Sequence, residues 1–250
     1  MYKLGLKLWS INKNYIKPAQ KLYEKKLFDY IELFAVPNSY NEYINLWKSL
    51  DIPYVIHAPH FTVGLNLAKK EMLNSNLLLA AEAIKYADKL AAKFIIFHPG
   101  IDGDLNQTVF QLNKINDPRI LIENKPYFTN DKKFICNGYS PQDIEFVLKM
   151  TNLGFCFDIG HAICSANAQN IEPFDYLLKF NNLKPKMYHL SDGKGLMDDH
   201  LHLGAGMFDL GKIINFILPN SLISLETEKK FSDNLDDFEQ DIWYFRNLMK

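Results

Sequence analysis

The chain has few cysteines and no long apolar run, and both absences limit what it can be. Its three cysteines, Cys136, Cys156 and Cys164, are odd in number and show no C-x-x-C spacing, which argues against a disulfide framework and against a thiolate zinc site. No apolar stretch approaches the length of a membrane span, and the N-terminus turns polar soon after Trp9. We therefore expect a soluble, cytoplasmic protein.

Arginine is also scarce, because Arg119 and Arg246 are the only two among 28 basic residues, and the net charge is -1. Domains that bind nucleic acid are usually basic over at least one face. The composition therefore gives no overall signal for nucleic acid, although a local basic patch can coexist with a neutral total.

What the chain does contain is a repeated alternation of apolar runs and helical patterns. The eight runs, which read as strands, are Leu4–Trp9, Phe28–Phe34, Pro53–His57, Lys93–His98, Arg119–Glu123, Gly154–Asp158, Lys186–Leu190 and Leu222–Glu226. The helical segments include Ser39–Leu50, Met72–Ala92, Pro141–Met150, Phe208–Leu218 and Asp233–Met249. Most runs are apolar throughout, as strands buried on both faces are. The pattern predicts one α/β domain over residues 1–250, a (β/α)8 TIM barrel with a closed, parallel, eight-stranded sheet, and leaves an open doubly wound sheet as the alternative.

Histidine and acidic residues stand at the ends of these runs or in the loops that follow them. None of the seven histidines lies in a segment predicted to be helical. Because the C-terminal ends of barrel strands meet at one mouth, these side chains should become neighbours. Imidazole and carboxylate groups suit divalent metals. The sequence thus predicts a metal site with nine candidate ligands: His57, His98, Glu123, Asp158, His161, His189, Asp198, His200 and Glu226.

Three further residues carry less weight, as groups that contact the substrate or orient a ligand: Glu32, His60 and His202. An acid that closes an apolar strand needs a cation or hydrogen bonds. For Glu123 and Glu226 the alternative to a metal is therefore a salt bridge with a lysine such as Lys125 or Lys229.

These motifs resemble the xylose isomerase-like TIM-barrel superfamily, and most closely the family 2 apurinic endonucleases of the endonuclease IV type. The most specific pieces are H-A-P at 57–59, F-H-P-G at 97–100, F-D-I-G-H at 157–161, and D-D-H at 198–200 with the glycines at 204 and 206. The resemblance implies up to three Zn²⁺ ions. One would take His57, His98 and Glu123. A second, bridged by Glu123, would take Asp158, His189 and Glu226, and a third would take His161, Asp198 and His200.

The implied reaction is hydrolysis of a phosphodiester by a metal-bound hydroxide that attacks phosphorus, with Glu123, Glu226 and His189 as the catalytic residues. The implied substrate is abasic DNA or a small phosphorylated sugar. Two features depart from the endonuclease pattern. The family usually follows H-A-P with a tyrosine, where this chain has His60, and no counterpart of the arginine that enters the DNA duplex is evident. We therefore expect weaker cleavage at abasic sites than in a full family member.

The competing interpretation is a sugar isomerase or epimerase of the same superfamily. Such an enzyme holds one ion, Mn²⁺ or another divalent metal, and the matching ligands here are Glu123, Asp158, His189 and Glu226. The two glutamates would then act as acid and base. The remaining five candidates have no necessary role in that reaction.

Overall fold

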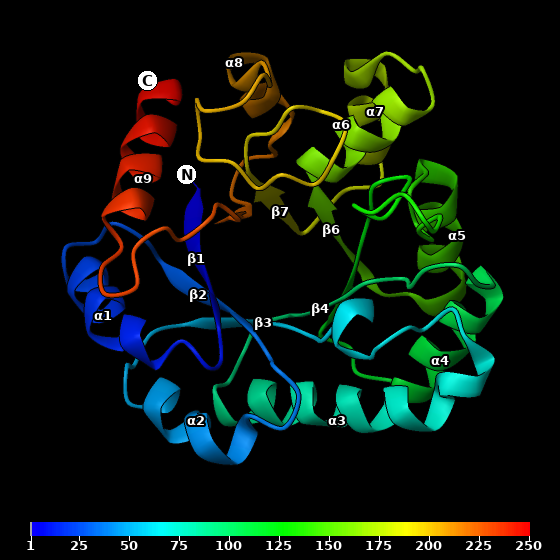
Figure 1. Cartoon of the computed structure of the whole chain (residues 1–250), viewed down its shortest axis with the longest axis horizontal. Helices are drawn as coiled ribbons and strands as arrows, with labels where there is room; N and C mark the ends of the chain where they lie inside the picture. The colour runs from blue at the N-terminus through cyan, green and yellow to red at the C-terminus, as the bar shows by residue number, and fades with distance from the viewer. Residues whose placement is uncertain (1) are drawn as a thin grey trace.

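The computed structural model describes residues 2–250, and within them the chain forms a closed barrel of eight parallel strands. The strands are β1 Lys3–Trp9, β2 Tyr30–Phe34, β3 Tyr54–His57, β4 Ile95–Phe97, β5 Ile120–Glu123, β6 Gly154–Asp158, β7 Met187–Leu190 and β8 Leu222–Leu225. Each strand pairs with the next one in sequence, and β8 pairs with β1 to close the barrel. Figure 1 shows the strands at the centre with the helices around them. The predicted TIM barrel is confirmed.

The helices follow the predicted segments closely at most positions. They are α1 Ile16–Glu24, α2 Tyr40–Lys48, α3 Leu73–Lys89, α4 Leu105–Ile115, α5 Pro141–Thr151, α6 Ile159–Ala168, α7 Pro173–Asn181, α8 Leu210–Ile213 and α9 Asp236–Leu248, with short 3₁₀ turns η1 Lys13–Tyr15, η2 Phe61–Val63, η3 Lys70–Met72 and η4 Ile214–Phe216. Among residues 2–250, no helix has the length and apolarity that a bilayer crossing requires.

One predicted helix, Phe208–Leu218, is too long. The structure keeps α8 only from Leu210 to Ile213 and tightens into η4 up to Phe216. Ile217 is already extended, and Leu218 precedes Pro219, whose ring disfavours helical backbone at the residue before it.

The barrel interior is built in layers, and the layers explain the site. One apolar layer consists of Tyr30, Val55, Ile96, Leu121, Cys156, Met187 and Leu222, which pack against one another inside the barrel. Side chains on a strand alternate between its two faces, so residues two positions further on also point inward. Those residues are Lys7, two positions after Gly5, and then Glu32, His57, His98, Glu123, Asp158, His189 and Ser224. A polar layer therefore lies directly above the apolar layer, on the side of the barrel mouth.

Gly5 fits this arrangement because a larger residue would collide with its neighbour. A Cβ at Gly5 would lie 2.3 Å from Cζ of Tyr30. The Tyr30 ring passes over Gly5, and its hydroxyl hydrogen-bonds with Ser224 Oγ at 3.0 Å. The tyrosine thereby fills the floor beneath the polar layer.

Candidate metal centre

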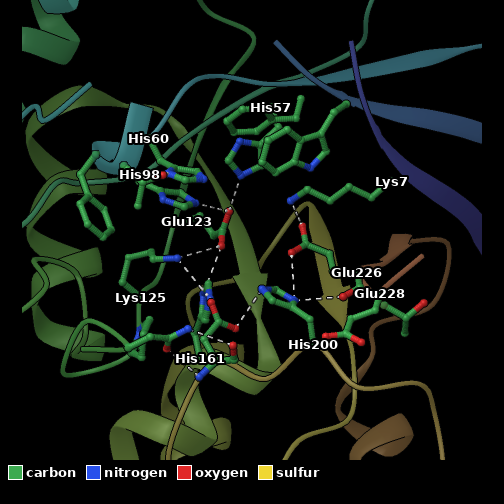
Figure 2. A pocket seen from close by; sticks show the side chains of 18 of the residues that line it. Lys7, His57, His60, His98, Glu123, Lys125, His161, His200, Glu226 and Glu228 are labelled. Carbon is green, nitrogen blue, oxygen red and sulfur yellow. Dashed lines mark hydrogen bonds and ion pairs between the residues drawn. The ribbon is translucent and has the colours of Figure 1, made fainter. Parts of the chain in front are cut away.

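The barrel mouth opens into a cavity of about 580 Å³ whose walls come from most of the strand-end loops. Figure 2 shows the labelled side chains converging on it. Seven of the nine predicted ligands line the cavity: His57, His98, Glu123, His161, Asp198, His200 and Glu226. The other two, Asp158 and His189, are buried just beneath it. The cavity volume lies within the usual range for sites that bind small molecules.

Three of these residues form the inner group: His57, His98 and Glu123. His57 ends β3, His98 follows β4 and Glu123 ends β5, so three successive strands bring them together. Nε2 of His57 lies 3.2 Å and Nε2 of His98 lies 3.1 Å from Oε2 of Glu123. All three side chains are buried, and the group has the composition and proximity of a metal site.

Three others form the outer group: His161, Asp198 and His200. Nε2 of His161 lies 3.0 Å from Asp198 Oδ2, and Nε2 of His200 lies 3.1 Å from Asp198 Oδ1. Asp198 and His200 come from the long loop between β7 and α8 and are partly exposed. This group too brings its possible ligand atoms within 4.8 Å of one another.

His161 corrects one expectation, because it lies in the first turn of α6 and not in a loop. The prediction that no histidine occupies a helix is therefore wrong for this residue. Asp158 is the N-cap of α6, and its Oδ1 accepts a hydrogen bond from His161 N at 2.7 Å. Because the helix begins directly at the end of β6, the D-x-x-H spacing turns both side chains toward the mouth.

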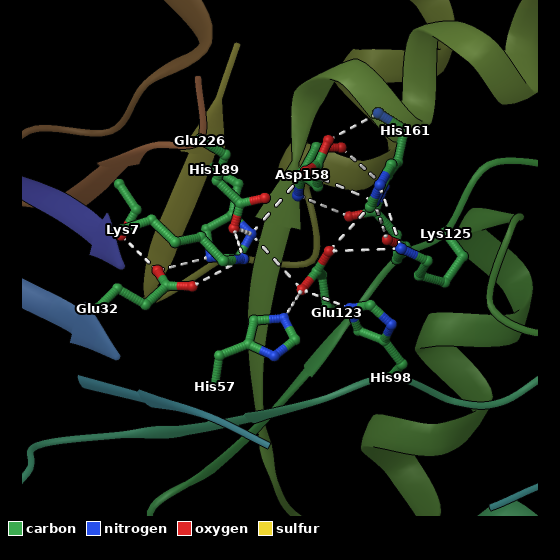
Figure 3. A network of polar contacts seen from close by, with 12 residues as sticks. Lys7, Glu32, His57, His98, Glu123, Lys125, Asp158, His161, His189 and Glu226 are labelled. Carbon is green, nitrogen blue, oxygen red and sulfur yellow. Dashed lines mark hydrogen bonds and ion pairs between the residues drawn. The ribbon is translucent and has the colours of Figure 1, made fainter. Parts of the chain in front are cut away.

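The remaining candidates, Asp158, His189 and Glu226, form the middle set. Nδ1 of His189 lies 2.8 Å from Glu226 Oε1, 3.5 Å from Glu123 Oε2 and 3.9 Å from Asp158 Oδ2 (Figure 3). These three residues do not form one three-donor group. Glu226 and His189 group with Glu32, whereas Asp158 groups with Glu123 and His161.

The histidine tautomers support cation binding. Nδ1 of His57 bonds to the carbonyl of Ala58 at 2.8 Å, Nδ1 of His161 to that of Asn124 at 2.9 Å, and Nδ1 of His200 to that of Glu226 at 2.9 Å. A carbonyl only accepts, so each Nδ1 carries the hydrogen and each Nε2 of a neutral ring presents a lone pair. These lone pairs face carboxylate oxygens, which also only accept, so each contact requires a proton or a metal ion between the two atoms.

The spacing of the donor atoms fits a metal as well. Two ligands bound to one Zn²⁺ at about 2.0–2.1 Å in tetrahedral geometry lie roughly 3.3 Å apart. The contacts of the inner and outer groups measure 3.0–3.2 Å. Nδ1 of His98 is buried without a hydrogen-bond partner among the described residues. The donor set therefore fits divalent ions that favour nitrogen and oxygen ligands.

The electrostatics of the two groups differ. Burial, together with nearby Lys125, holds the pKa of His98 well below its usual range. Burial also opposes the charged form of His161, but Asp158 and Asp198 outweigh it and raise the pKa of His161 to about 10. The pKa of Glu123 stays well below its usual range against the effect of burial, because His98 and His189 surround it.

Asp192 organises the loop that carries the outer group. Its carboxylate accepts hydrogen bonds from the backbone N–H groups of Gly193, Gly204, Gly206 and Phe208 at 2.8–3.1 Å. A Cβ at Gly206 would lie 2.2 Å from Asp192 Oδ1, so glycine is required there. Gly204 and Gly206 were noted from the sequence, whereas Asp192, which accepts from both of their N–H groups, was not.

The three candidates of lower weight occupy different places. Glu32 is fully buried and its Oε2 accepts from Nε2 of His189 at 3.0 Å, which orients that ring. The His60 ring stacks on His98 at 5.4 Å between centroids and lines the cavity, and burial lowers the pKa of His60 to about 3. The His202 ring faces Asp241 Oδ2 at 2.8 Å, toward α9.

Two lysines of the site carried no prediction as metal-centre residues. Lys7 forms ion pairs with Glu226 and with Glu32, the latter at 3.1 Å, and its pKa is raised because these carboxylates outweigh the effect of burial. Lys125 lies 3.2 Å from His161 Nε2 and 4.0 Å from Glu123 Oε1. Glu226 thus pairs with Lys7 and not with Lys229, whose Nζ hydrogen-bonds the Thr227 carbonyl.

Fold and site together define a closed β/α barrel whose mouth gathers histidine and carboxylate side chains that could hold divalent metals. Residues 24–248 match the xylose isomerase-like TIM barrel family, and the chain belongs to it. It is 28% identical over 213 residues to the uncharacterized protein MJ1614 of Methanocaldococcus jannaschii, covering 77% of each chain. It is 29% identical over 212 residues to a probable endonuclease 4 of Mycoplasmopsis pulmonis, covering 74% of this chain and 73% of that relative.

Solved structures share the whole fold. A D-tagatose 3-epimerase-like protein superposes with a TM-score of 0.75 at 21% identity, covering 99% of this chain and 97% of the other. Endonuclease IV from Thermus thermophilus superposes with a TM-score of 0.71 at 18% identity, covering 99% of this chain and 98% of the other. The family relationship predicted from the motifs is confirmed.

Proposed function

We propose that this protein is a multinuclear, divalent-metal-dependent phosphoester hydrolase of the endonuclease IV type, with zinc as its metal. The observation that carries the proposal is the presence of two separate three-donor groups, the inner group that includes Glu123 and the outer group that contacts Glu123 through His161. Oε2 of Glu123 faces Nε2 of His57 and of His98, and its Oε1 lies 3.2 Å from Nδ1 of His161, whose Nε2 faces Asp198. A mononuclear isomerase has no need for these extra ligands.

In this proposal the chain's own residues hold the reactants in place. The inner and outer groups would each bind an ion, and Glu123 would extend its charge to both. Glu32 fixes the ring of His189, so that Nδ1 faces Glu226 and the cavity side of the centre. Bound divalent ions would supply Lewis-acid charge and lower the pKa of water near a phosphoester. Glu226, which lines the cavity, would contact the reacting groups, and His189 beneath it would hold the Glu226 carboxylate in place.

The relatives agree with this chemistry, because several of the curated ones are named probable endonuclease 4. Abasic DNA is the substrate that this name suggests, and a small phosphorylated sugar is the alternative that the cavity of about 580 Å³ could also admit.

The three free cysteines of the described chain are buried thiols, which suits a reducing compartment, so we propose that the protein is cytoplasmic.

A mononuclear sugar isomerase or epimerase is the second candidate, and the middle set favours it. Glu123, Asp158 and Glu226 all approach Nδ1 of His189 within 3.9 Å, and these four residues would hold one Mn²⁺ or similar ion. Glu123 and Glu226 would then exchange the proton beside the sugar carbonyl.

One preparation can separate the two candidates. Metal-free protein reconstituted with Zn²⁺ or with Mn²⁺ should be assayed on abasic duplex DNA and on a panel of free and phosphorylated sugars. We expect phosphoester cleavage that requires both His57 and Asp198. Sugar interconversion that persists in His57→Ala but is lost in Glu123→Gln would establish the isomerase and reject the hydrolase.

A further inference from the structure

Lys7 lies in the polar layer, to which each strand from β2 to β7 contributes a histidine or carboxylate side chain from within the strand or just after its end. It lies on β1, and its Cα pairs in register with Glu32 on β2. Its Nζ forms ion pairs with Oε1 of Glu226 and with Oε1 of Glu32, and the side chain reaches the cavity (Figures 2 and 3). A cation is thus built into the wall of the candidate metal centre.

The lysine uses the oxygen that a metal ion of the middle set would use. Oε1 of Glu226 contacts Lys7 Nζ and also lies 2.8 Å from Nδ1 of His189. Glu32 holds the lysine at this place, because its Oε2 is fixed by Ser224 and by Nε2 of His189 while its Oε1 lies 3.1 Å from Lys7 Nζ. Its Oε1 has no hydrogen bond within residues 2–250, so Lys7 is the cation that offsets its charge there. An ion at the middle set would therefore meet a positive charge on the same carboxylate.

The charge balance of the network leads to the same result. Its five carboxylates are those of Glu32, Glu123, Asp158, Asp198 and Glu226, and its two ammonium groups are those of Lys7 and Lys125. With neutral histidines as ligands, five negative and two positive charges leave three negative charges. Two divalent ions would change this to one positive charge, and three ions to three positive charges. Because unbalanced buried charge is costly, three ions are disfavoured in the wild type, and the Lys7 ammonium contributes one unit of that excess.

We infer that the ammonium of Lys7 takes the place of a third metal ion, so that the chain binds two divalent ions, one in the inner group and one in the outer group. This inference rests on the proposed multinuclear function and narrows it. The middle set then presents Glu226 and the Lys7 ammonium to the substrate, with Asp158 and His189 buried beneath them. The lysine would contact an anionic oxygen of the substrate that a third ion would otherwise bind.

The test counts ions per chain by mass spectrometry of the metal after metal-free protein has been saturated with Zn²⁺ and freed of excess. We expect two ions in the wild type and three in Lys7→Met, because Glu226 and His189 are then free to complete a middle site. Lys7→Arg keeps the charge and should stay at two. Lys229→Met removes another lysine that lines the same cavity but bonds a carbonyl, and should also stay at two.

Each other result is decisive. Three ions in the wild type, or two in Lys7→Met, would overturn the role of Lys7 while leaving the hydrolase proposal intact. One ion in the wild type would overturn the multinuclear function as well. If Lys7→Met does not fold, Lys7→Gln removes the positive charge but keeps a hydrogen-bond donor beside Glu32, and it should bind three. Anomalous scattering from zinc in wild-type crystals provides a second measurement, and a peak between Glu226 and His189 would reject the inference.

Discussion

The inner and outer groups offer the same ligand chemistry on different supports. The inner group stands at the ends of three adjacent strands, and its side chains are at most 9% exposed. The outer group combines the first turn of α6 with a long loop, and its His200 side chain is 33% exposed. Register fixes the inner group when the barrel closes. The outer group forms only if the loop also folds, so the two should respond differently to mutation and to pH.

The largest effect is expected where the two groups meet, at Glu123. Glu123→Gln keeps the size of the side chain but removes the charge that faces both groups. Activity should fall by about 10³-fold or more, which corresponds to roughly 4 kcal/mol of transition-state stabilisation. Steady-state kinetics on the substrate identified above would measure it.

The matched control is Glu228→Gln, which changes an exposed carboxylate of the same cavity. It should leave activity within a few fold. A Glu123→Gln enzyme within tenfold of the wild type would mean that the two groups do not share this carboxylate in function.

The next effect should be confined to the outer group. His161→Ala/Asp198→Ala removes two of its three ligands and should lose one ion per chain, while the inner ion remains, because the inner ligands belong to other strands. Metal analysis after reconstitution provides the count. Asp199→Ala is the control, since Asp199 is adjacent in sequence but accepts from Lys194 N. Loss of every ion in the double variant would show that the inner group cannot bind metal alone.

A third variant, Asp192→Ala, tests the loop between β7 and α8 without replacing a candidate ligand. Asp192→Ala leaves four backbone N–H groups without their acceptor, at a cost of about 1–3 kcal/mol for each group that stays buried. We expect faster hydrogen exchange over residues 193–208 and weaker binding of the outer ion, with the inner ion unaffected. Asp209→Ala removes a helix N-cap next to the same loop and should cost about 1 kcal/mol without changing the ion content. Unchanged exchange in Asp192→Ala would remove the aspartate from this role.

The contrast between the inner and outer groups also explains which residues of the site could be predicted from the sequence. The strand ends that carry His57, Glu123 and Asp158 were predictable, because apolar runs mark the strands and parallel strands end at one mouth. Lys7 was not singled out, because a lysine within an apolar run has no signature of its own. Its inward direction follows only from the period-2 phase that starts at Gly5, and its partners are set by register with Glu32. The phase was available in the sequence, whereas the register required the closed barrel.

Loop-carried features were harder to predict for a physical reason. The carboxylate of Asp192 acts through N–H groups up to 16 positions away, and loop backbone lacks the periodicity that locates strands. The position of His161 in a helix could have been inferred from Asp158, since an aspartate three residues earlier is a common N-cap. Histidine itself is a weak helix former and gave no signal.

The smallest predicted effect is a difference in how pH changes metal affinity. The pKa of His161 is raised to about 10 in the metal-free fold, so near neutral pH this ring carries a proton that an ion must displace. Affinity of the outer group should then rise with pH, by up to about tenfold per unit between roughly pH 6.5 and 9. The pKa of His98 lies well below its usual range, so this inner ligand has no proton to lose in that window.

Calorimetric zinc titrations in buffers of different ionisation enthalpy can compare the groups one at a time. His161→Ala/Asp198→Ala reports on the inner group, and His57→Ala/His98→Ala reports on the outer group. The protonation of His161 also makes the stability of the metal-free protein depend on pH. Because the folded pKa of His161 exceeds its unfolded value, the protonated ring stabilises the metal-free protein fully below about pH 6.5, and this contribution is lost as pH rises toward 10. Equal proton release from both groups would show that loop and strand supports do not set the protonation of their ligands.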